Sequence, residues 1–503
     1  MDPQPSLVEA PKSPLLRIPI EVIIHIASYL TTPEYGMFRL VCRHTEHNLF
    51  NSFVQEFFAK REFMLTEFSL QTLLDISKSR LRIYLKYLII NLERPTLRQY
   101  PHVIVQIHQG TANSIQAIQH NRLQEEYLSH QGLIASGQDL ELLTQALRNL
   151  PTLHTISLRD FFRCGRYRDG GDCCWHAYGA PTLVRETGIG YIQPSFRTQY
   201  RHEGMDGDFK TYARRTFWTI LRAMGKAKEM SSLPQLEVIL RNSWLPDDAF
   251  SIPRYFEPTI LPVLQNLKVL FLDLGHNSFP TIISTEGRQK NHSFLHLAAF
   301  LSKALSLEHL RLNFRNCPGS EARDILQWFA DVPTPSEYLP LALGNQSNVP
   351  GNLPELPHTP QFPHLVQLDI GMVEIELPLL LAIYMRYRES LRKISLHRVT
   401  LHSPPKSPPR PPNSWREFLH HITRLDFNLS TLRLSSLKER CKNSHSTLEF
   451  KFPGQREGED RSTREWNGRD WNYASREFIQ SMVTIGPGQQ WLYAPDSDSD
   501  DEV

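Results

Sequence analysis

The chain has 503 residues, and its 40% hydrophobic content is enough for sizeable cores in about two to four domains. Its 55 Lys and Arg residues nearly balance 53 Asp and Glu residues, so the charge of +2 favours neither nucleic acid nor a membrane surface. The N-terminal residues lack a secretory signal pattern, and no apolar run approaches the roughly 18 residues of a membrane helix. We therefore expect a protein of the cytosol or nucleus whose six cysteines are free thiols.

Residues 1–14 contain four prolines and few apolar residues, so we expect a flexible lead-in before the first helix. Ile18-Pro19 predicts the start of that helix, because proline in a first turn loses no hydrogen bond, and Glu21 then lies near the positive end of the helix dipole. An apolar stripe follows at positions i, i+3, i+4 and i+7, occupied by Ile23, Ile26, Ala27 and Leu30. Val22 and Ile24 lie off this stripe, which indicates that the helix is covered on two sides.

Thr32-Pro33-Glu34 predicts a second helix, with Thr32 as its N-cap and an acid in its first turn. Apolar residues continue as far as Cys42-Arg43, namely Met37, Phe38, Leu40 and Val41. Two short helices joined by a tight turn are therefore expected. Five aromatic residues then predict a helical segment that ends near Leu65 and attaches these helices to the next domain: Phe50, Phe53, Phe57, Phe58 and Phe63.

The order of these residues resembles the F-box, a small helical module that binds the Skp-type adaptor of cullin ubiquitin ligases; the matching positions are Ile18-Pro19-x-Glu21, Ile26, Leu30 and Leu40-Val41-Cys42-Arg43. Three positions depart from the family: Ile18 replaces the usual leucine, Gly36 lies inside the second helix, and no tryptophan follows Arg43. The resemblance implies a helical module over residues 15–65. It also implies six adaptor-binding residues, which are Leu16, Pro19, Ile26, Leu30, Val41 and Cys42. An ordinary helical hairpin that caps a larger domain is the alternative interpretation.

From Ser69 to Leu434, a predicted helix followed by a predicted strand recurs along the chain. The strand entries carry aliphatic or aromatic residues at L-x-x-L-x-L spacing: Leu85/Leu88/Ile90, Leu153/Ile156/Leu158, Leu267/Leu270/Leu272, Leu307/Leu310/Leu312, Leu365/Leu368/Ile370, Leu391/Ile394/Leu396 and Ile422/Leu425/Phe427, with a weaker match at Leu236/Ile239. One such unit cannot bury its apolar face alone, whereas stacked units can, and alternating helices and strands require parallel strand pairing.

This recurrence resembles the leucine-rich repeat and implies an α/β fold, in which the F-box is followed by an irregular leucine-rich-repeat-like solenoid over residues 66–437. Two features depart from the family. The asparagine or cysteine that normally follows the motif is out of register, and successive units lie between 26 residues (Leu365 to Leu391) and 114 residues (Leu153 to Leu267) apart, against a family period of roughly 20–29. Chance matches in a leucine-rich chain are the alternative.

Three insertions are expected in this region, at residues 159–230, 331–364 and 402–414. The first has 13 basic and 8 acidic residues among its aromatics, and this mild excess favours a loop packed on the repeats over a site for single-stranded nucleic acid. Its last part, residues 211–230, predicts a helix with one apolar face formed by Phe217, Ile220, Leu221 and Met224. The other two insertions are rich in proline and predict a surface loop and a polyproline rod.

One group of residues has the chemistry of zinc ligands, namely Cys164, Cys173, Cys174 and His176. The two adjacent cysteines and the lack of a C-x-x-C pair argue against a zinc site. The sequence has no phosphate-binding glycine loop, nucleophile elbow or metalloprotease motif, so we predict no catalytic residue, metal or cofactor. Residues 438–503 are polar and charged, and are expected to form a loosely held extension with an acidic tail.

The two resemblances together imply a substrate-recruiting subunit of a cullin-type (SCF) ubiquitin ligase, similar to the F-box proteins with degenerate leucine-rich repeats of filamentous fungi. Its F-box is expected to bind a Skp-type adaptor and thereby the cullin complex, while the repeats bind a target protein that the sequence does not name. A protein-interaction scaffold that does not promote degradation is the alternative. A nucleic-acid binder that uses residues 159–230 is a third hypothesis.

Overall fold

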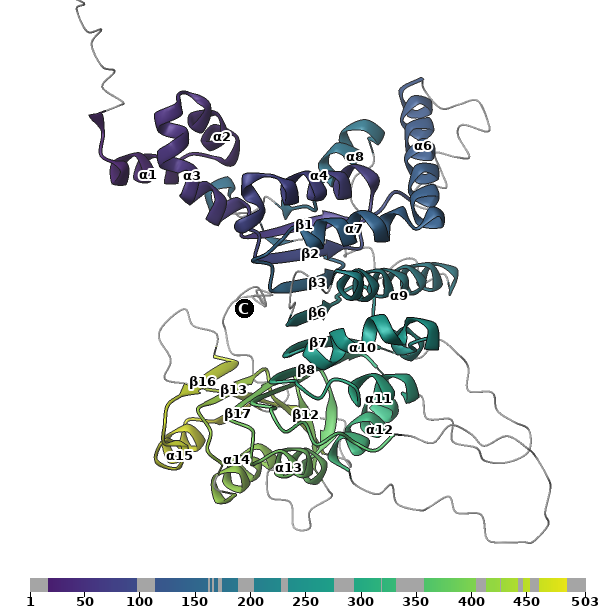
Figure 1. The fold of residues 1–503 in the computed structure, drawn as a ribbon. Helices are drawn as coiled ribbons and strands as arrows, with labels where there is room; N and C mark the ends of the chain where they lie inside the picture. Colours follow the sequence, from purple (N-terminus) through teal and green to yellow (C-terminus); the bar gives the residue numbers. More distant parts are fainter. Residues whose placement is uncertain are drawn as a thin grey trace, which may run out of the picture.

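The computed structural model describes residues 17–96, 114–161, 163–164, 167–170, 174–188, 203–227, 234–275, 294–317, 319–331, 357–403, 413–425, 427–441, 447–452 and 461–485. It has the mixed α/β class expected from the sequence. Three N-terminal helices project from one end of a large sheet whose helices lie along one face (Figure 1).

The N-terminal helices are α1 (Ile20–Ser28), α2 (Thr32–Leu40) and α3 (Arg43–Phe57). Helix α2 begins one residue earlier than predicted, because Thr31 rather than Thr32 is the N-cap. The backbone N–H of Thr31 donates to the Glu34 carboxylate at 2.9 Å, which completes a capping box. A two-residue connection leads from α3 into the first strand, β1.

The large sheet has ten strands in the order β1-β2-β3-β6-β7-β8-β9-β11-β13-β16. Their bounds are Lys60–Met64, Tyr87–Asn91, Thr155–Arg159, Gln235–Ile239, Val269–Gly275, His309–Asn316, Gln367–Gly371, Lys393–His397, Thr431–Ser435 and Thr463–Asn467. Every neighbouring pair is parallel except β13 and β16. The first nine strands thus follow one another in space as they do in sequence.

Two aliphatic rows run across this sheet in register. From β2 to β13, the first row is Leu88, Ile156, Leu236, Leu270, Leu310, Leu368, Ile394 and Leu432, and the second is Ile90, Leu158, Val238, Leu272, Leu312, Ile370, Leu396 and Leu434. All sixteen side chains are buried in one continuous core cluster. Because side chains alternate along a strand, the residues between the rows, such as Glu237 and Arg311, belong to the opposite face.

Helices between successive strands cover the aliphatic face: α4 (Glu67–Lys78), α7 (Gln138–Arg148), α9 (Glu203–Lys226), α10 (Glu257–Asn266), α11 (Leu295–Leu301), α12 (Gly319–Ala330), α13 (Leu377–Arg386) and α14 (Ser414–Arg424). Successive helices pack against each other at α4–α7, α7–α9, α9–α10, α12–α13 and α13–α14 (Figure 1). Helices α6 (Ser114–Ser136) and α8 (Ala180–Thr187) pack together near β1 and β2. The predicted apolar face of α9 is confirmed, since Phe217, Ile220, Leu221 and Met224 are all buried.

A second, smaller sheet has five strands in the order β10-β12-β14-β15-β17. Their bounds are Glu374–Glu376, Thr400–Ser403, Lys438–Cys441, Thr447–Lys451 and Val483–Ile485. The first three strands each follow a strand of the large sheet after a sharp corner. At the three corners Met372, Arg398 and Ser436 have φ values of 56°, 51° and 50°, in the left-handed region that residues other than glycine rarely adopt. Three consecutive units therefore share the same unusual backbone turn.

Three sequence-based assignments are wrong in detail. The helical segment expected to reach Leu65 ends at Phe57, and Lys60–Met64 is the edge strand β1. The strand expected at residues 422–427 begins inside α14, and the strand of that unit is β13, whose buried residues are Leu432 and Leu434. The weaker repeat match at Leu236/Ile239 is displaced by one residue at its second position, because Val238 rather than Ile239 pairs with Leu158 in the buried row.

The residues after Leu437 also differ from the expected loosely held extension. Within residues 438–485, the described chain adds strands to both sheets and forms α15 (Trp471–Gln480). Five large apolar side chains of this segment are buried in the core and hold it against the rest of the fold: Phe450, Phe452, Trp471, Phe478 and Met482. Most of the predicted insertions at 331–364 and 402–414, the lead-in 1–14 and the acidic tail lie outside the described residues. The domain limits given above remain predictions.

Leu432 and Leu425 offer a test of this corrected register. We expect Leu432→Ala to destabilise the fold by about 2–5 kcal/mol, because its fully buried side chain leaves a cavity in the aliphatic row. Leu425 is only partly buried, so Leu425→Ala is expected to cost clearly less. Thermal melts followed by tryptophan fluorescence measure both effects, and equal shifts of the melting temperature would contradict the observed register.

Candidate functional site

Helices α1 and α2 leave a group of large apolar side chains exposed. Ile23 and Ala27 of α1 are buried with Tyr35, Leu49 and Phe57 in a small core cluster. The apolar side chains that stay exposed on the two helices and directly after them are Ile20, Val22, Ile24, Ile26, Tyr29, Met37, Leu40 and Val41. So many exposed apolar side chains on two short helices are typical of a protein-interaction surface. We call these eight residues the apolar face.

Three of the six predicted adaptor-binding residues are exposed in the structure. Pro19, Ile26 and Val41 are exposed, Ile26 by 39% and Val41 by 62%. Leu30 is partly buried and packs against the small core cluster. Leu16 lies outside the described residues. Exposed positions can contact a partner without refolding, so Pro19, Ile26 and Val41 are the accessible members of the predicted set.

Cys42 has a local structural role that the sequence did not reveal. Its Sγ accepts a hydrogen bond from the Thr45 backbone N–H at 3.5 Å and thereby caps α3. Hydrogen bonding to Thr45 also lowers the pKa of the Cys42 thiol below its ordinary value. Among the residues whose side chains are described, Cys42 and Cys317 are free thiols.

Sequence reasoning missed most of the apolar face. Of its eight residues, only Ile26 and Val41 were predicted to bind the adaptor. The sequence nevertheless contains a sign of this face. Val22 and Ile24 lie off the apolar stripe of α1, and their position predicts that a second side of the helix is covered. Within the described structure that second side is uncovered, and it forms part of the apolar face.

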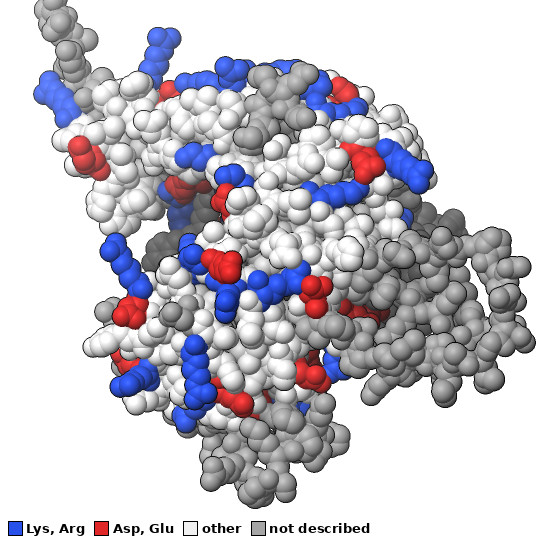
Figure 2. Space-filling view, turned by 60° about the horizontal axis from the view of Figure 1, so that its bottom comes forward, with Lys and Arg blue, Asp and Glu red and all other residues white. Residues whose placement is uncertain are grey.

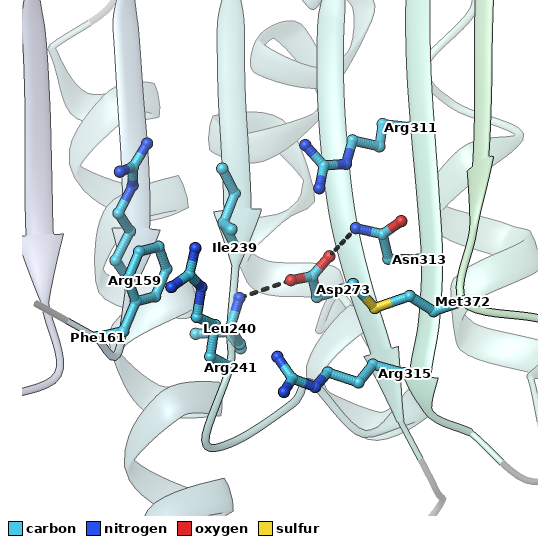
Figure 3. Close-up of a pocket in the computed structure, with 10 residues that line it drawn as sticks. All are labelled: Arg159, Phe161, Ile239, Leu240, Arg241, Asp273, Arg311, Asn313, Arg315 and Met372. Carbon is cyan, nitrogen blue, oxygen red and sulfur yellow. Dashed lines mark hydrogen bonds between the residues drawn. The ribbon is translucent and has the colours of Figure 1, made fainter. Parts of the chain in front are cut away.

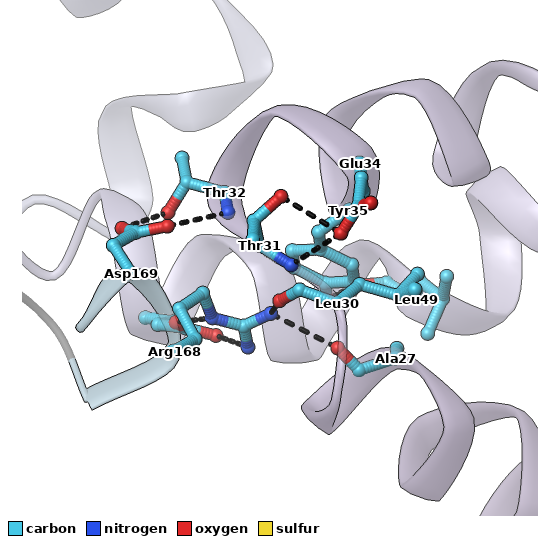
Figure 4. Close-up of polar contacts among 10 residues, drawn as sticks. Ala27, Leu30, Thr31, Thr32, Glu34, Tyr35, Leu49, Arg168 and Asp169 are labelled. Atoms are coloured by element: carbon cyan, nitrogen blue, oxygen red, sulfur yellow. Dashed lines mark hydrogen bonds and ion pairs between the residues drawn. The ribbon is translucent and has the colours of Figure 1, made fainter.

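A short segment after β3 holds the ends of α1 and α2 (Figure 4). The Arg168 guanidinium donates to the carbonyl oxygens of Ala27 at 2.9 Å and Leu30 at 2.8 Å, and it makes two hydrogen bonds to Glu56, at 2.6 and 2.7 Å. The Asp169 carboxylate accepts from the backbone N–H of Thr32 at 2.7 Å and from its hydroxyl at 2.6 Å. We call Arg168 and Asp169 the clasp.

The charges of the clasp match the two helix ends that they contact. Arg168 lies at the C-terminal end of α1, where free carbonyls carry partial negative charge, and Asp169 lies at the N-terminal end of α2, where free N–H groups carry partial positive charge. The Arg168 side chain is only 11% exposed and also lies 4.7 Å from the Tyr35 ring centroid. Water therefore competes little for these bonds.

The segment that follows the clasp is attached to the sheet. The backbone N–H of Tyr178 donates to the Glu62 carbonyl at 2.8 Å, which pairs the segment with the free edge of β1. The Arg61 guanidinium lies 5.0 Å from the Trp175 ring and 5.7 Å from the Tyr178 ring. The chain around Arg168 thus connects the N-terminal helices to the edge of the large sheet.

We expect Arg168→Gln to loosen the N-terminal helices. The substitution removes the ion pair with Glu56 and weakens the bonds to the carbonyls of Ala27 and Leu30, at a cost of about 1.5–3 kcal/mol for charged hydrogen bonds. Hydrogen–deuterium exchange measured by mass spectrometry should show faster exchange in α1 and α2, with no change in β9 and β11. Arg185→Gln is the matched control, because Arg185 is an exposed arginine of α8. Unchanged exchange in α1 and α2 would show that the clasp does not hold them.

A hollow of about 40 Å³ lies at the carboxyl ends of strands β3 to β9 (Figure 3). It is lined by Arg159, Phe161, Ile239, Leu240, Arg241, Asp273, Arg311, Asn313, Arg315 and Met372. Asp273 accepts hydrogen bonds from the Leu240 backbone N–H and from the Asn313 side-chain amide, both at 2.8 Å. The hollow therefore combines four arginines with one carboxylate that is already hydrogen-bonded.

Burial raises the pKa of Asp273 to about 6, against an ordinary value of 3.8. A carboxyl whose pKa is raised by folding contributes most to stability below its ordinary pKa, and this contribution is lost as the pH rises through about 6. The wild type should therefore lose stability relative to Asp273→Asn as the pH rises from about 4 to about 7. Melting temperatures of both proteins across this range test this, and parallel pH profiles would contradict it.

The predicted zinc-ligand group is only partly described. Strands β4 (Arg163–Cys164) and β5 (Cys174–Trp175) pair antiparallel and place Cys164 opposite Cys174, while Cys173 lies outside the described residues. His176 lies 3.8 Å from the Glu93 carboxylate. No group of three His, Cys, Asp or Glu side chains in the described part of the chain is arranged to hold a metal ion.

Surface charge is mixed. Figure 2 shows Lys and Arg side chains interspersed with Asp and Glu over the face in view, without a continuous field of one sign. This pattern agrees with the overall charge of +2. None of the helices in the described ranges is long and apolar enough to span a membrane.

Comparison with known families confirms the first resemblance. The family model of the F-box domain matches residues 15–47, which cover α1, α2 and the start of α3. The chain therefore contains an F-box domain. F-box domains bind Skp-type adaptors in SCF ubiquitin ligases, generally within the substrate-recognition subunit, and proteins that carry them are typically adaptors without catalytic activity. Among curated proteins, no sequence matches the chain.

Proposed function

We propose that this protein is the substrate-recruiting subunit of an SCF ubiquitin ligase, in which the apolar face binds the Skp-type adaptor and the sheet region binds a target protein. The observation that carries this proposal is the exposed apolar face on helices that match the F-box domain. Burial of such side chains supplies most of the affinity in protein interfaces, and a few anchors dominate.

The stacked helix and strand units support the target-binding role. Nine strands follow one another in sequence order, and the corners at Met372, Arg398 and Ser436 repeat one backbone turn. These features agree with an irregular leucine-rich-repeat-like solenoid, as in the F-box proteins of filamentous fungi that the sequence resembles. Repeat stacks present extended surfaces on which strand ends and loops contact a protein partner.

The clasp supports a fixed geometry between the two surfaces. Arg168 and Asp169 contact both α1 and α2, while the following segment pairs with β1. A ligase subunit acts by holding its target close to the loaded ubiquitin, so its two binding surfaces must keep a defined separation. F-box proteins of SCF complexes are typically cytoplasmic or nuclear, and we place this protein there as part of the proposal.

Co-purification with a Skp-type adaptor tests the adaptor-binding role. We expect the double variant Ile26→Ala, Val41→Ala to bind the adaptor at least about tenfold more weakly than the wild type, because two interface anchors at about 1–3 kcal/mol each are lost. Both side chains are exposed, so the melting temperature should stay nearly unchanged.

The matched control is the double variant Ile118→Ala, Leu128→Ala, which removes two exposed aliphatic side chains from α6. This control should bind the adaptor as the wild type does. If the wild type is folded and fails to bind, the adaptor-binding role is wrong. If the adaptor binds but turnover of proteins captured by the sheet region does not depend on the apolar face, the scaffold alternative replaces the ligase subunit.

A further inference from the structure

The hollow beside Asp273 concentrates positive charge at one place on an otherwise mixed surface. Its four arginines come from different parts of the large sheet: Arg159 ends β3, Arg241 follows β6, and Arg311 and Arg315 belong to β8. Figure 3 shows the side chains of Arg311 and Arg315 extending from β8 toward the space beside Asp273, while the Arg241 side chain lies against Phe161 on the other side of the hollow. Asp273 is the one carboxylate among the lining residues, beside four guanidinium groups, of which Arg159 is also paired with Glu237.

Two of these arginines form no ion pair with a carboxylate of the described chain. Arg241 lies over the Phe161 ring at 4.1 Å and Arg311 lies 5.6 Å from the Phe271 ring, so aromatic contacts hold both side chains in place. Arg159 differs, because its guanidinium donates to the Tyr87 hydroxyl at 2.9 Å and lies 3.8 Å from Glu237. The guanidinium groups of Arg241 and Arg311 are thus not occupied by a direct ion pair within the described chain.

Asp273 accepts no hydrogen bond from these arginines, although its carboxylate attracts the Arg311 guanidinium electrostatically. Its two oxygens accept from the Leu240 N–H and the Asn313 amide, and these bonds fix the loop that carries Arg241 and the strand that carries Arg311. Asp160 acts similarly on the next residues, because its carboxylate accepts from the backbone N–H groups of Arg241 at 2.6 Å and Asn242 at 2.8 Å. Buried carboxylates thus hold the backbone that positions the arginines.

We propose that this hollow binds a phosphoryl group. Guanidinium groups that approach from several strands suit a tetrahedral dianion with three free oxygens, whereas a planar carboxylate is satisfied by one arginine in its own plane. A volume of about 40 Å³ exceeds the roughly 10–15 Å³ that one water needs, which leaves room for a group of a few heavy atoms. The phosphoryl group belongs either to a phosphorylated side chain of a recruited protein, which rests on the proposed function, or to a small phosphate compound.

Calorimetric titration of the full chain, without the adaptor, tests this site. The ligands are phosphoserine blocked at both ends, inorganic phosphate in a second arm, and blocked serine as the negative control. We expect the blocked phosphoserine to bind and the double variant Arg241→Gln, Arg311→Gln to bind it at least about tenfold more weakly. Arg388→Gln, which removes an exposed arginine after α13, should bind it as the wild type does.

Hydrogen–deuterium exchange of the wild type keeps the proposal testable if the double variant does not fold. Bound phosphoserine should protect the backbone around residues 239–243 and 311–315. Tighter binding of blocked phosphoserine than of inorganic phosphate assigns the site to a phosphorylated protein, and the reverse order assigns it to a small phosphate compound. No binding of either ligand at millimolar concentration, or equal binding by the double variant, would overturn the site.

The same samples separate this inference from the proposed function. Adaptor co-purification depends on α1 and α2, whereas phosphoserine binding depends on residues at the ends of β3, β6 and β8. Loss of phosphoserine binding with adaptor binding intact removes only the phosphoryl site. Loss of adaptor binding with phosphoserine binding intact removes only the ligase-subunit role.

Discussion

The burial of two aliphatic rows between the large sheet and its helices is the interaction on which the rest of this structure depends. A single strand and helix cannot exclude water from residues such as Leu88 and Ile90, so each unit is stable only beside the next. The rows require that each unit supply two aliphatic residues in register and one covering helix. The rows place little restriction on the length of the chain between units, because the entropic cost of closing a loop rises only slowly with the length of the loop. Unit separations from 26 to 114 residues are therefore compatible with one regular sheet.

The same rows determine where polar chemistry collects. Strand residues alternate between faces, so burying Leu270 and Leu272 on one side puts Phe271 and Asp273 on the other, next to Arg311 and Asn313 of the neighbouring strand. Parallel pairing brings all carboxyl ends to one edge, and the loops after β3 and β6 add Phe161 and Arg241 there. The arginine hollow is thus a consequence of the parallel order. Hydrogen bonds to Asp273 and aromatic rings beside Arg241 and Arg311 hold these charged groups in place, while burial still raises the pKa of Asp273.

The sequence predicted what depends on local pattern and missed what depends on distant pairing. The F-box motif and six of the seven full aliphatic triplets are confirmed at the residue level. The seventh failed because the amphipathic helix α14 places Ile422 on its own buried face, so an apolar spacing typical of strands occurs within a helix. The clasp joins Asp169 to Thr32 across 137 residues, and the hollow joins arginines from three separate units. No local spacing encodes such pairs.

Fixing the F-box to the sheet requires contacts that resist rotation, and one contact at one helix cannot provide this. The two residues of the clasp are adjacent in sequence, yet they bind two helix ends of opposite polarity, so α1 and α2 are held at two points. The direct connection from α3 into β1 supplies a third point, and the pairing of Tyr178 with the β1 edge anchors the segment that carries the clasp. Three separated points define an orientation. The exposed apolar face therefore keeps a fixed direction relative to the strand ends, which is what a protein that bridges two partners requires.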